Sequence, residues 1–283
     1  MARNKSIPDD RLIALIHSYF TIECKKDVTK LKFPDITAYI TAHGYPDYQV
    51  TTLRRTQAAR EYIESLKEAE EKTAEVSQKN GGKIIKIVCD ITDTGMLAGV
   101  IKQVNKNHDI KLLINNAGAG NLKSFENLTE KEAADTVKLN ALGLTMMTKV
   151  CLPYMGEDSF ILNVSSIGSF APTANMSVYC ATKAYVSSFS MAIAEELEEK
   201  GITVTAVCPG PMETNFFNAG NIKEGSSKKF FSLPRENPEK IAEKSMKAMM
   251  KGKRMYIGKF YYKLYRFLSK ILPNDLAISL SKL

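Results

Sequence analysis

The sequence predicts an α/β protein in which a mostly parallel, Rossmann-like sheet is flanked by helices and preceded by a small helical segment. Short apolar runs alternate with longer amphipathic stretches from about residue 83 to residue 258, which is typical of repeated β-α units. Several of these runs are followed by small polar residues, as buried parallel strands are where they meet a loop. The first 66 residues show helical periodicity instead.

The apolar runs predict five strands with helices following them. The expected strands lie near residues 84–89, 111–115, 159–165, 203–207 and 254–257. Because no strand pattern precedes residue 83, we expect the strand at 111–115 to have an open edge. Either a substitute strand near 36–41 or the strand at 83–90 is expected to cover it.

Residues 1–66 are expected to form a helical segment of their own. An amphipathic helix near 10–20 is followed by one that begins at Pro34, and residues 48–78 show a further helical pattern. Three short helices with Arg54 and Arg55 on the last are loosely similar to a helix-turn-helix DNA-binding module. Such a pattern more often belongs to helices that simply pack, so DNA binding is the disfavoured interpretation.

Composition indicates one sizeable α/β domain, residues 67–283, with the helical segment as an appendage. Five cysteines are scattered without metal-ligand spacing, which favours buried thiols of a reducing, cytoplasmic compartment and no metal site. The N-terminus is charged and has no long apolar core, so no secretory signal is expected. No apolar stretch reaches about 18 residues, so no transmembrane helix is expected either.

The tail, residues 251–283, carries most of the net charge. Eight Lys or Arg against one acid, Asp275, give it eight minus one, or +7, of the formal +8. Apolar residues can share one face of a helix here, and basic residues another; these are Phe260, Leu264, Phe267, Leu268 and Ile271, against Lys259, Lys263, Arg266 and Lys270. The favoured interpretation is a helix that docks on the domain or on a second subunit, and the alternative is contact with an anionic membrane surface or a route for an apolar substrate.

Tyr179 and Lys183 are the residues that most directly indicate chemistry. A spacing of four places a phenol and an ammonium on one helix face, one turn apart. We expect the ammonium to lower the tyrosine pKa towards neutrality, which suits a proton donor and acceptor. Ser166 lies thirteen residues upstream, after the strand at 159–165, where ligands collect in α/β sheets.

An ordered set of motifs runs through the same region. It consists of Asn115-Asn-Ala-Gly118, Asn140, Ser166, Tyr179 with Lys183, and Pro209-Gly210. This set resembles the short-chain dehydrogenase/reductase family from about Lys83 to Gly258. The resemblance implies that Tyr179 exchanges a proton with the substrate oxygen and that Ser166 orients this oxygen. It further implies that Lys183 lowers the tyrosine pKa and binds the nicotinamide ribose, and that Asn140 holds a water.

The resemblance also implies an NAD or NADP site. The matching positions are Asp90 and Ile91 at the adenine, Asn116, Ala117 and Gly118 along the adenosine ribose, and Pro209, Gly210, Met212 and Thr214 at the carboxamide, with Tyr179 and Lys183. Some of these residues have simpler interpretations. Asp90 could form a turn, Asn140 could be a surface amide, and Ser165 competes with Ser166.

The first two strands that the resemblance implies, and the family's glycine-rich phosphate turn, have no counterpart in the sequence. The nearest match to the turn, residues 40–48, has Ala42, Pro46 and Tyr48 at the three glycine positions, where side chains would block the phosphates. We therefore expect weakened dinucleotide binding.

Together these features predict an NAD(P)-dependent oxidoreductase that interconverts a ketone or aldehyde and an alcohol. Paired phenylalanines at 216–217 and 230–231 suggest an apolar substrate, and the family resemblance implies a homo-oligomer. The alternative is a catalytically impaired protein with a binding or regulatory role. In one version of this alternative the N-terminal segment binds DNA.

Overall fold

The computed structural model describes residues 7–22, 30–45, 48–64, 87, 89–104, 109–214, 216, 228–273, 275, 276 and 278. The chain divides into two compact units, Met1–Val88 and Cys89–Leu283. The domain boundary predicted near residue 66 stays a prediction, since residues 65–86 lie outside the described part of the chain.

The first unit is helical in its described residues. It contains α1 (Asp9–Ile22), α2 (Phe33–Ala42), α3 (Val50–Arg55) and helical residues 57–64. Pro34 lies in the first turn of α2 as predicted, where its missing N–H costs no hydrogen bond. The predicted continuation of the last helix through residues 65–78 lies outside the described residues.

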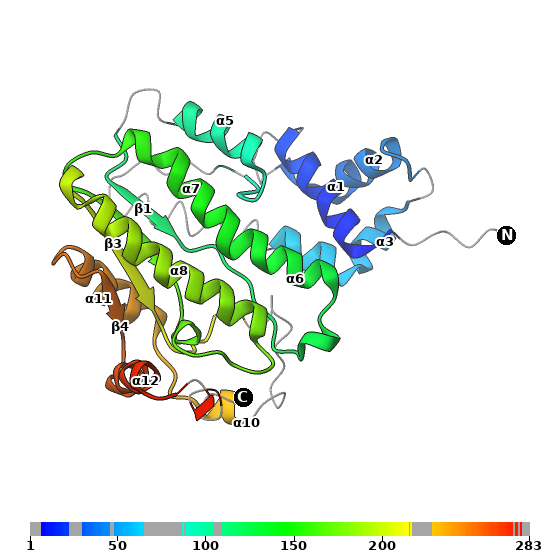
Figure 1. Ribbon diagram of the computed structural model, residues 1–283. Coiled ribbons are helices and arrows are strands. Elements are labelled where there is room, and N and C mark those ends of the chain that lie inside the picture. Colours follow the sequence, from blue (N-terminus) through cyan, green and yellow to red (C-terminus); the bar gives the residue numbers. More distant parts are fainter. Residues whose placement is uncertain are drawn as a thin grey trace. The chain divides into compact units, whose positions relative to one another are not determined.

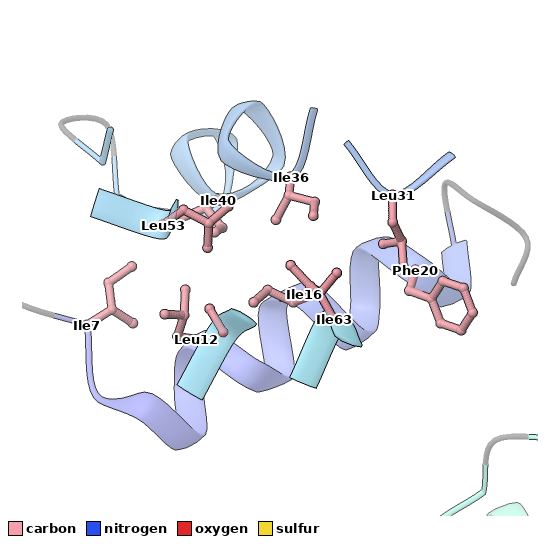
Figure 2. Close-up of a cluster of buried hydrophobic side chains, with 10 residues drawn as sticks. Ile7, Leu12, Ile16, Phe20, Leu31, Ile36, Ile40, Leu53 and Ile63 are labelled. Carbon is pink, nitrogen blue, oxygen red and sulfur yellow. The ribbon is translucent and has the colours of Figure 1, made fainter. Parts of the chain in front are cut away.

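An apolar core joins these helices (Figure 2). Leu12 and Ile16 of α1 pack in one cluster with Ile36 and Ile40 of α2 and with Leu53 of α3. All five side chains are fully buried. Since residues 36–41 belong to α2, the prediction of a substitute strand there is wrong. Burying these side chains requires the helical period of three and four residues, which a strand would not provide.

The second unit is built on a parallel sheet of order β1-β2-β3-β4 (Figure 1). The strands are β1 (Leu112–Asn115), β2 (Ser159–Val164), β3 (Ile202–Cys208) and β4 (Met255–Ile257). Every pairing is parallel, with Asn115 opposite Asn163 and Val164 opposite Val207. Four predicted strands are thus confirmed. Of the fifth, residues 87 and 89 are described and lie in no strand, and the rest lie outside the described residues.

One helix of this unit precedes β1, and the others lie between or after the strands in the chain. The helices are α5 (Thr94–Val104), α6 (Glu130–Val137), α7 (Leu144–Cys151), α8 (Ser177–Glu196), α10 (Lys228–Ser232), α11 (Pro238–Met249) and α12 (Phe260–Ile271). A π-helical turn, Lys138–Gly143, joins α6 to α7. No helix in the described residues is long and apolar enough to span a bilayer.

Both faces of the sheet are covered at the central strand β2, whereas Leu112 and Ile114 of β1 are exposed. Ile161 of β2 packs in one cluster with Cys151 of α7 and Ala194 of α8. Its neighbour Leu162 points to the other face and packs with Ile241 of α11. This alternation has the period of two residues that a strand imposes, and it explains why the strands are almost continuously apolar.

A buried polar network crosses β1 and β2. The Asn115 Nδ2 donates to Asn163 Oδ1 at 2.8 Å and to Thr148 Oγ1 of α7 at 3.0 Å. The Asn163 Nδ2 in turn donates to Ser190 Oγ of α8 at 2.9 Å. Because each buried amide has partners, these asparagines fix the register of strands and helices without a large desolvation cost.

We expect Ile161→Ala to lower the free energy of unfolding of the protein. The side chain is fully buried between β2 and the two helices, so its truncation leaves a cavity that costs about 2–5 kcal/mol. Urea unfolding followed by circular dichroism measures the loss. Met96→Ala, at an exposed position of α5, is the control and should change stability by less than about 1 kcal/mol.

Candidate active site

Tyr179 and Lys183 lie one turn apart near the beginning of α8. The Lys183 Nζ lies 5.8 Å from the centroid of the Tyr179 ring. Tyr179 is half-buried and packs against Phe216, with ring centroids 5.5 Å apart. The helical spacing that the sequence predicted therefore brings the phenol and the amine to the same place.

The Lys183 amine is buried and anchored. Its side chain is only 4% exposed, and Nζ donates a hydrogen bond of 2.8 Å to the carbonyl oxygen of Val164, the last residue of β2. Burial lowers the pKa of Lys183 to about 8, because desolvation disfavours the charged form. The amine thus lies at the carboxyl end of the central strand, where α/β proteins bind ligands.

The pKa of Tyr179 departs from the sequence prediction. Burial raises it to about 12, and a hydrogen bond with Ser166 acts in the opposite direction. For the protein by itself, the expected lowering of the tyrosine pKa by Lys183 is therefore wrong. Desolvation of the phenolate is the largest cause of the rise and outweighs the hydrogen bond with Ser166.

The two candidate serines have different hydrogen bonds. Ser165 is buried, and its hydroxyl donates to the carbonyl oxygen of Lys183 at 2.8 Å and shares a contact of 2.8 Å with Ser187 Oγ. Ser166 precedes a short 3-10 turn, and its Oγ accepts from the N–H of Gly168 at 3.1 Å. Ser165 therefore fastens α8 to the sheet, which favours Ser166 as the residue that meets a substrate.

Asn140 belongs to the π-helical turn and is 1% exposed. Its Nδ2 donates to the carbonyl oxygen of Ala119 at 2.8 Å and to Thr182 Oγ1 at 3.0 Å, while its Oδ1 accepts from the N–H of Ala119 at 2.8 Å. The interpretation of Asn140 as a surface amide is therefore wrong. Its side chain clamps the loop after β1 against α8, and the π-helical turn, a feature often found at functional sites, places it there.

The loop after β1 approaches the tyrosine and the lysine closely. A Cβ on Gly118 would lie 3.1 Å from Lys183 Nζ, and one on Gly120 would lie 2.4 Å from a carbon of the Tyr179 ring. Only glycine fits at Gly120, since a methyl group there would overlap the ring. The sequence prediction missed Gly120, although the repeated Ala-Gly of residues 117–120 was a visible signal.

Glu236 was also missed, and it holds the segment after β3. This buried carboxylate accepts from the N–H of Gly210 at 2.6 Å and from the N–H of Lys259 at 2.8 Å. Both partners are backbone groups distant in sequence, so no pattern of side chains could have revealed it. Glu236 thereby joins the predicted carboxamide segment to the residue that precedes α12.

A cavity of about 670 Å³ opens at this end of the sheet and contains the tyrosine, the lysine and Ser166. It is lined by several predicted cofactor residues, which are Asn116, Gly118, Pro209, Gly210, Met212 and Thr214. Apolar side chains form much of the remaining wall, and they include Met176, Phe216, Phe230, Leu233, Leu264 and Leu268. Of the predicted residues, Asp90, Ile91, Ala117 and Asn140 are not part of this lining.

Asp90 makes the turn that its simpler interpretation implied. Its Oδ1 accepts from the N–H and from the hydroxyl of Thr92, both at 2.8 Å, and these hydrogen bonds lower its pKa. Ile91 lies beside the π-helical turn, where a Cβ on Gly143 would come within 3.0 Å of it. Contact of Asp90 and Ile91 with an adenine stays a prediction.

Comparisons with known proteins agree with this arrangement. Residues 49–225 match the family described as short chain dehydrogenase, a range that starts and ends earlier than the predicted one. The chain is 28% identical over 263 residues to "Probable oxidoreductase EphD" of Mycobacterium tuberculosis, covering 86% of this chain and 44% of that protein. It is 33% identical over 155 residues to the 3-ketodihydrosphingosine reductase of Bacteroides thetaiotaomicron, covering 54% of this chain and 58% of that protein. The chain thus spans about half the length of these relatives.

Solved structures show the same fold. A short-chain dehydrogenase from Streptomyces avermitilis has a TM-score of 0.58 and 25% identity, covering 70% of this chain and 79% of that one. A short-chain dehydrogenase from Sphingobium yanoikuyae in complex with NADPH has a TM-score of 0.59 and 22% identity, covering 75% of this chain and 83% of that one.

Replacing Lys183 by Met should change how stability depends on pH. Because burial holds the pKa of Lys183 at about 8, below its usual 10.5, the unfolded chain binds more protons than the folded chain between these values. Lys183 therefore makes stability rise with pH across that window, by roughly 3 kcal/mol in total. Urea unfolding of both proteins at several values between about pH 7.5 and pH 10.5 measures the effect. Over this range the free energy of unfolding of the wild type should rise by roughly 3 kcal/mol relative to that of the variant.

The comparison between variants isolates one group, because the other titrating residues are common to both proteins. Lys200→Met, at an exposed position after α8, is the matched control, and its stability should run parallel to that of wild type. Parallel curves for Lys183→Met as well would show that the amine is not desolvated.

Proposed function

The chain belongs to the short-chain dehydrogenase family, and on this premise we propose that it uses NAD or NADP to interconvert a ketone or aldehyde and its alcohol. The observation that carries the proposal is that Ser166, Tyr179 and Lys183 line one cavity at the carboxyl end of the sheet. A carbonyl oxygen placed there would meet a hydroxyl group that orients it and a phenol that gives it a proton.

Tyr179 is proposed as the acid and base. With its pKa raised to about 12, the phenol is protonated at neutral pH and can donate to a carbonyl oxygen as negative charge develops there. In the reverse direction the phenol must first lose its own proton, and the phenolate then takes the proton of the alcohol, so the raised pKa favours reduction of the carbonyl. Ser166 is proposed to orient the substrate oxygen through its O–H, since its Oγ already accepts from the Gly168 N–H.

Lys183 and Asn140 are proposed to support this proton transfer. The Lys183 pKa of about 8 keeps most of the amine charged at neutral pH while leaving it able to release a proton. Its Nζ is held by Val164 and lies close to the Gly118 backbone. Asn140 holds the loop that carries Ala119; the water that the family resemblance assigns to it stays a prediction.

The cavity suits the nicotinamide end of a dinucleotide. Gly118 leaves a space that a Cβ would fill, next to the Lys183 amine, and Asn116, Lys183 and Thr214 offer polar groups along the wall. Pro209 and Gly210 also line this space. A bound nicotinamide supplies or accepts the hydride.

The turn that binds the pyrophosphate of the dinucleotide in this family is not found at its nearest match in the sequence. Residues 40–42 belong to helix α2, and His43 ends it, so the nearest match to the phosphate turn does not join a strand to a helix. The family turn offers backbone N–H groups and a helix N-terminus to two phosphates. We therefore propose that dinucleotide binding is weaker than is usual in this family.

The substrate is proposed to be apolar, because the cavity wall is formed largely by Met, Phe and Leu side chains. The name of the Bacteroides relative, a reductase of 3-ketodihydrosphingosine, is compatible with a long-chain ketone. Assembly as a homo-oligomer and a cytoplasmic location are proposed with it, the second because Cys151, Cys180 and Cys208 are buried thiols.

Tyr179→Phe should abolish turnover and leave dinucleotide affinity nearly unchanged, because it removes the exchangeable proton but keeps the ring. Oxidation of NADH and NADPH with a panel of apolar ketones, followed by absorbance, measures turnover. Tyr185→Phe, on the same helix but hydrogen-bonded to Thr145 and more exposed, is the control and should keep turnover. Equal turnover in wild type and Tyr179→Phe would refute the assignment.

Calorimetry with NADH and NADPH should give dissociation constants two to four orders of magnitude above the family norm. Two charge-assisted hydrogen bonds are missing at about 1.5–3 kcal/mol each, or roughly 3–6 kcal/mol together. The sequence prediction names Arg54, Arg55 and Arg60 as the residues that would compensate. Tight binding that survives Arg54→Gln, Arg55→Gln and Arg60→Gln together would contradict this prediction, and absence of binding would favour the regulatory alternative.

A further inference from the structure

Helix α12 presents an apolar stripe to solvent. Phe260 is 78% exposed, Phe267 and Ile271 are each 60% exposed, and Leu264 is 44% exposed. Their spacing of four, three and four residues puts them on one face of the helix. We call these four residues the α12 stripe. Contiguous exposed apolar side chains of this size mark interaction sites on soluble proteins.

The stripe is not the face by which α12 packs on its own domain. Tyr262 is fully buried, and its hydroxyl donates to the carbonyl oxygen of Pro234 at 2.6 Å. Glu236 accepts from the N–H of Lys259, just before the helix. These contacts fix the rotation of α12 about its axis, so the stripe faces outward as a defined feature of the fold. The helix thus docks on its domain as predicted, but through Tyr262 rather than through the apolar face that the sequence analysis named.

Basic side chains flank the stripe. Lys259, Lys263 and Lys270 are exposed, and at 100° per residue they follow one edge of it. The sequence of α12 contains no Asp or Glu, and residues 251–283 carry a net charge of +7 (eight Lys or Arg minus Asp275). An apolar face that combines aromatic rings with a lysine-rich edge is the pattern of a helix that lies in a membrane interface.

The stripe also borders the cavity. Tyr261, Leu264, Tyr265 and Leu268 of α12 line the cavity wall, and Leu264 belongs to the stripe as well. Tyr261 is a lining residue and is more than half exposed. The same helix therefore forms the wall of the candidate active site and its outer rim.

We propose that α12 docks this chain on an anionic phospholipid bilayer, with the α12 stripe in the acyl boundary and the lysines at the headgroups. An apolar substrate then reaches the cavity directly from the bilayer, past Tyr261 and Leu264; this second part rests on the proposed function. A second copy of the chain fits the stripe less well. A two-fold contact would bring the same lysines against each other, whereas anionic lipid neutralises them.

Sedimentation of the full chain with vesicles tests the docking without any enzymatic readout. Vesicles of phosphatidylcholine with phosphatidylserine should bind the protein, pure phosphatidylcholine vesicles should bind it far less, and added salt should release it. Phe267→Ser and Ile271→Ser should each lower the partition coefficient at least tenfold, because a buried apolar side chain is lost. Lys263→Gln and Lys270→Gln should each lower it about fivefold.

Matched controls lie elsewhere on the same unit. Phe125→Ser removes an aromatic ring that is 69% exposed, and Lys149→Gln removes an exposed lysine of α7; neither should alter partitioning. Melting temperatures show whether each variant is folded. Failure of the wild-type chain to bind anionic vesicles, or equal binding by the stripe variants and wild type, would overturn the docking. So would stripe-dependent self-association in gel filtration without vesicle binding.

Measurements of turnover distinguish a failure of the membrane docking from a failure of the proposed function. For a long-chain ketone carried in the vesicles, Phe267→Ser should lower the rate by as much as it lowers binding. For a small water-soluble ketone the rate should stay that of wild type, because Phe267 does not line the cavity. Vesicle binding without turnover of either ketone would support the docking and overturn the proposed function. Equal losses with both ketones would overturn delivery from the bilayer.

Discussion

The hydrogen bond from the Lys183 amine to the Val164 carbonyl is the interaction on which the candidate site depends. It joins the first turns of α8 to the end of β2, and so fixes the tyrosine relative to Ser166, which follows the same strand. A lysine can be buried there only if its polar atoms have partners, since an unpaired ammonium is costly to desolvate. The glycines of the loop after β1 then follow as a requirement, because the backbone must pass close to the amine and the phenol ring.

The sheet and the centre of the site could be predicted from sequence because their signals are local. Strands buried on both faces are continuous apolar runs, and their carboxyl ends are marked by Ser165 and Ser166 or by Pro209 and Gly210. Helical spacing then placed Lys183 next to Tyr179. Each inference used only neighbours in the chain, which is why four strands were placed correctly to within one residue at each end.

The errors have the opposite cause, since they concern environments formed by distant segments. The Tyr179 pKa is controlled by burial, which depends on how loops close over the ring and has no signal in the spacing of two residues. Asn140 resembled a surface amide because its partners, Ala119 and Thr182, lie far away in sequence. Residues 36–41 were considered as a strand to repair the edge of β1, yet their apolar residues recur at helical intervals and pack around Ile16 and Leu53.

Glu236 shows how a single buried group can couple parts of the molecule that the motifs treat separately. Its carboxylate receives one N–H from Gly210 and another from Lys259, and the peptide after Pro234 is further held by the Tyr262 hydroxyl. A change in the position of α12 must therefore strain either these hydrogen bonds or the segment from Pro209 to Thr214 that lines the cavity. The two acceptor oxygens of Glu236 thus link the outer helix to the inner wall, so a displacement of α12 is transmitted to the residues that line the cavity.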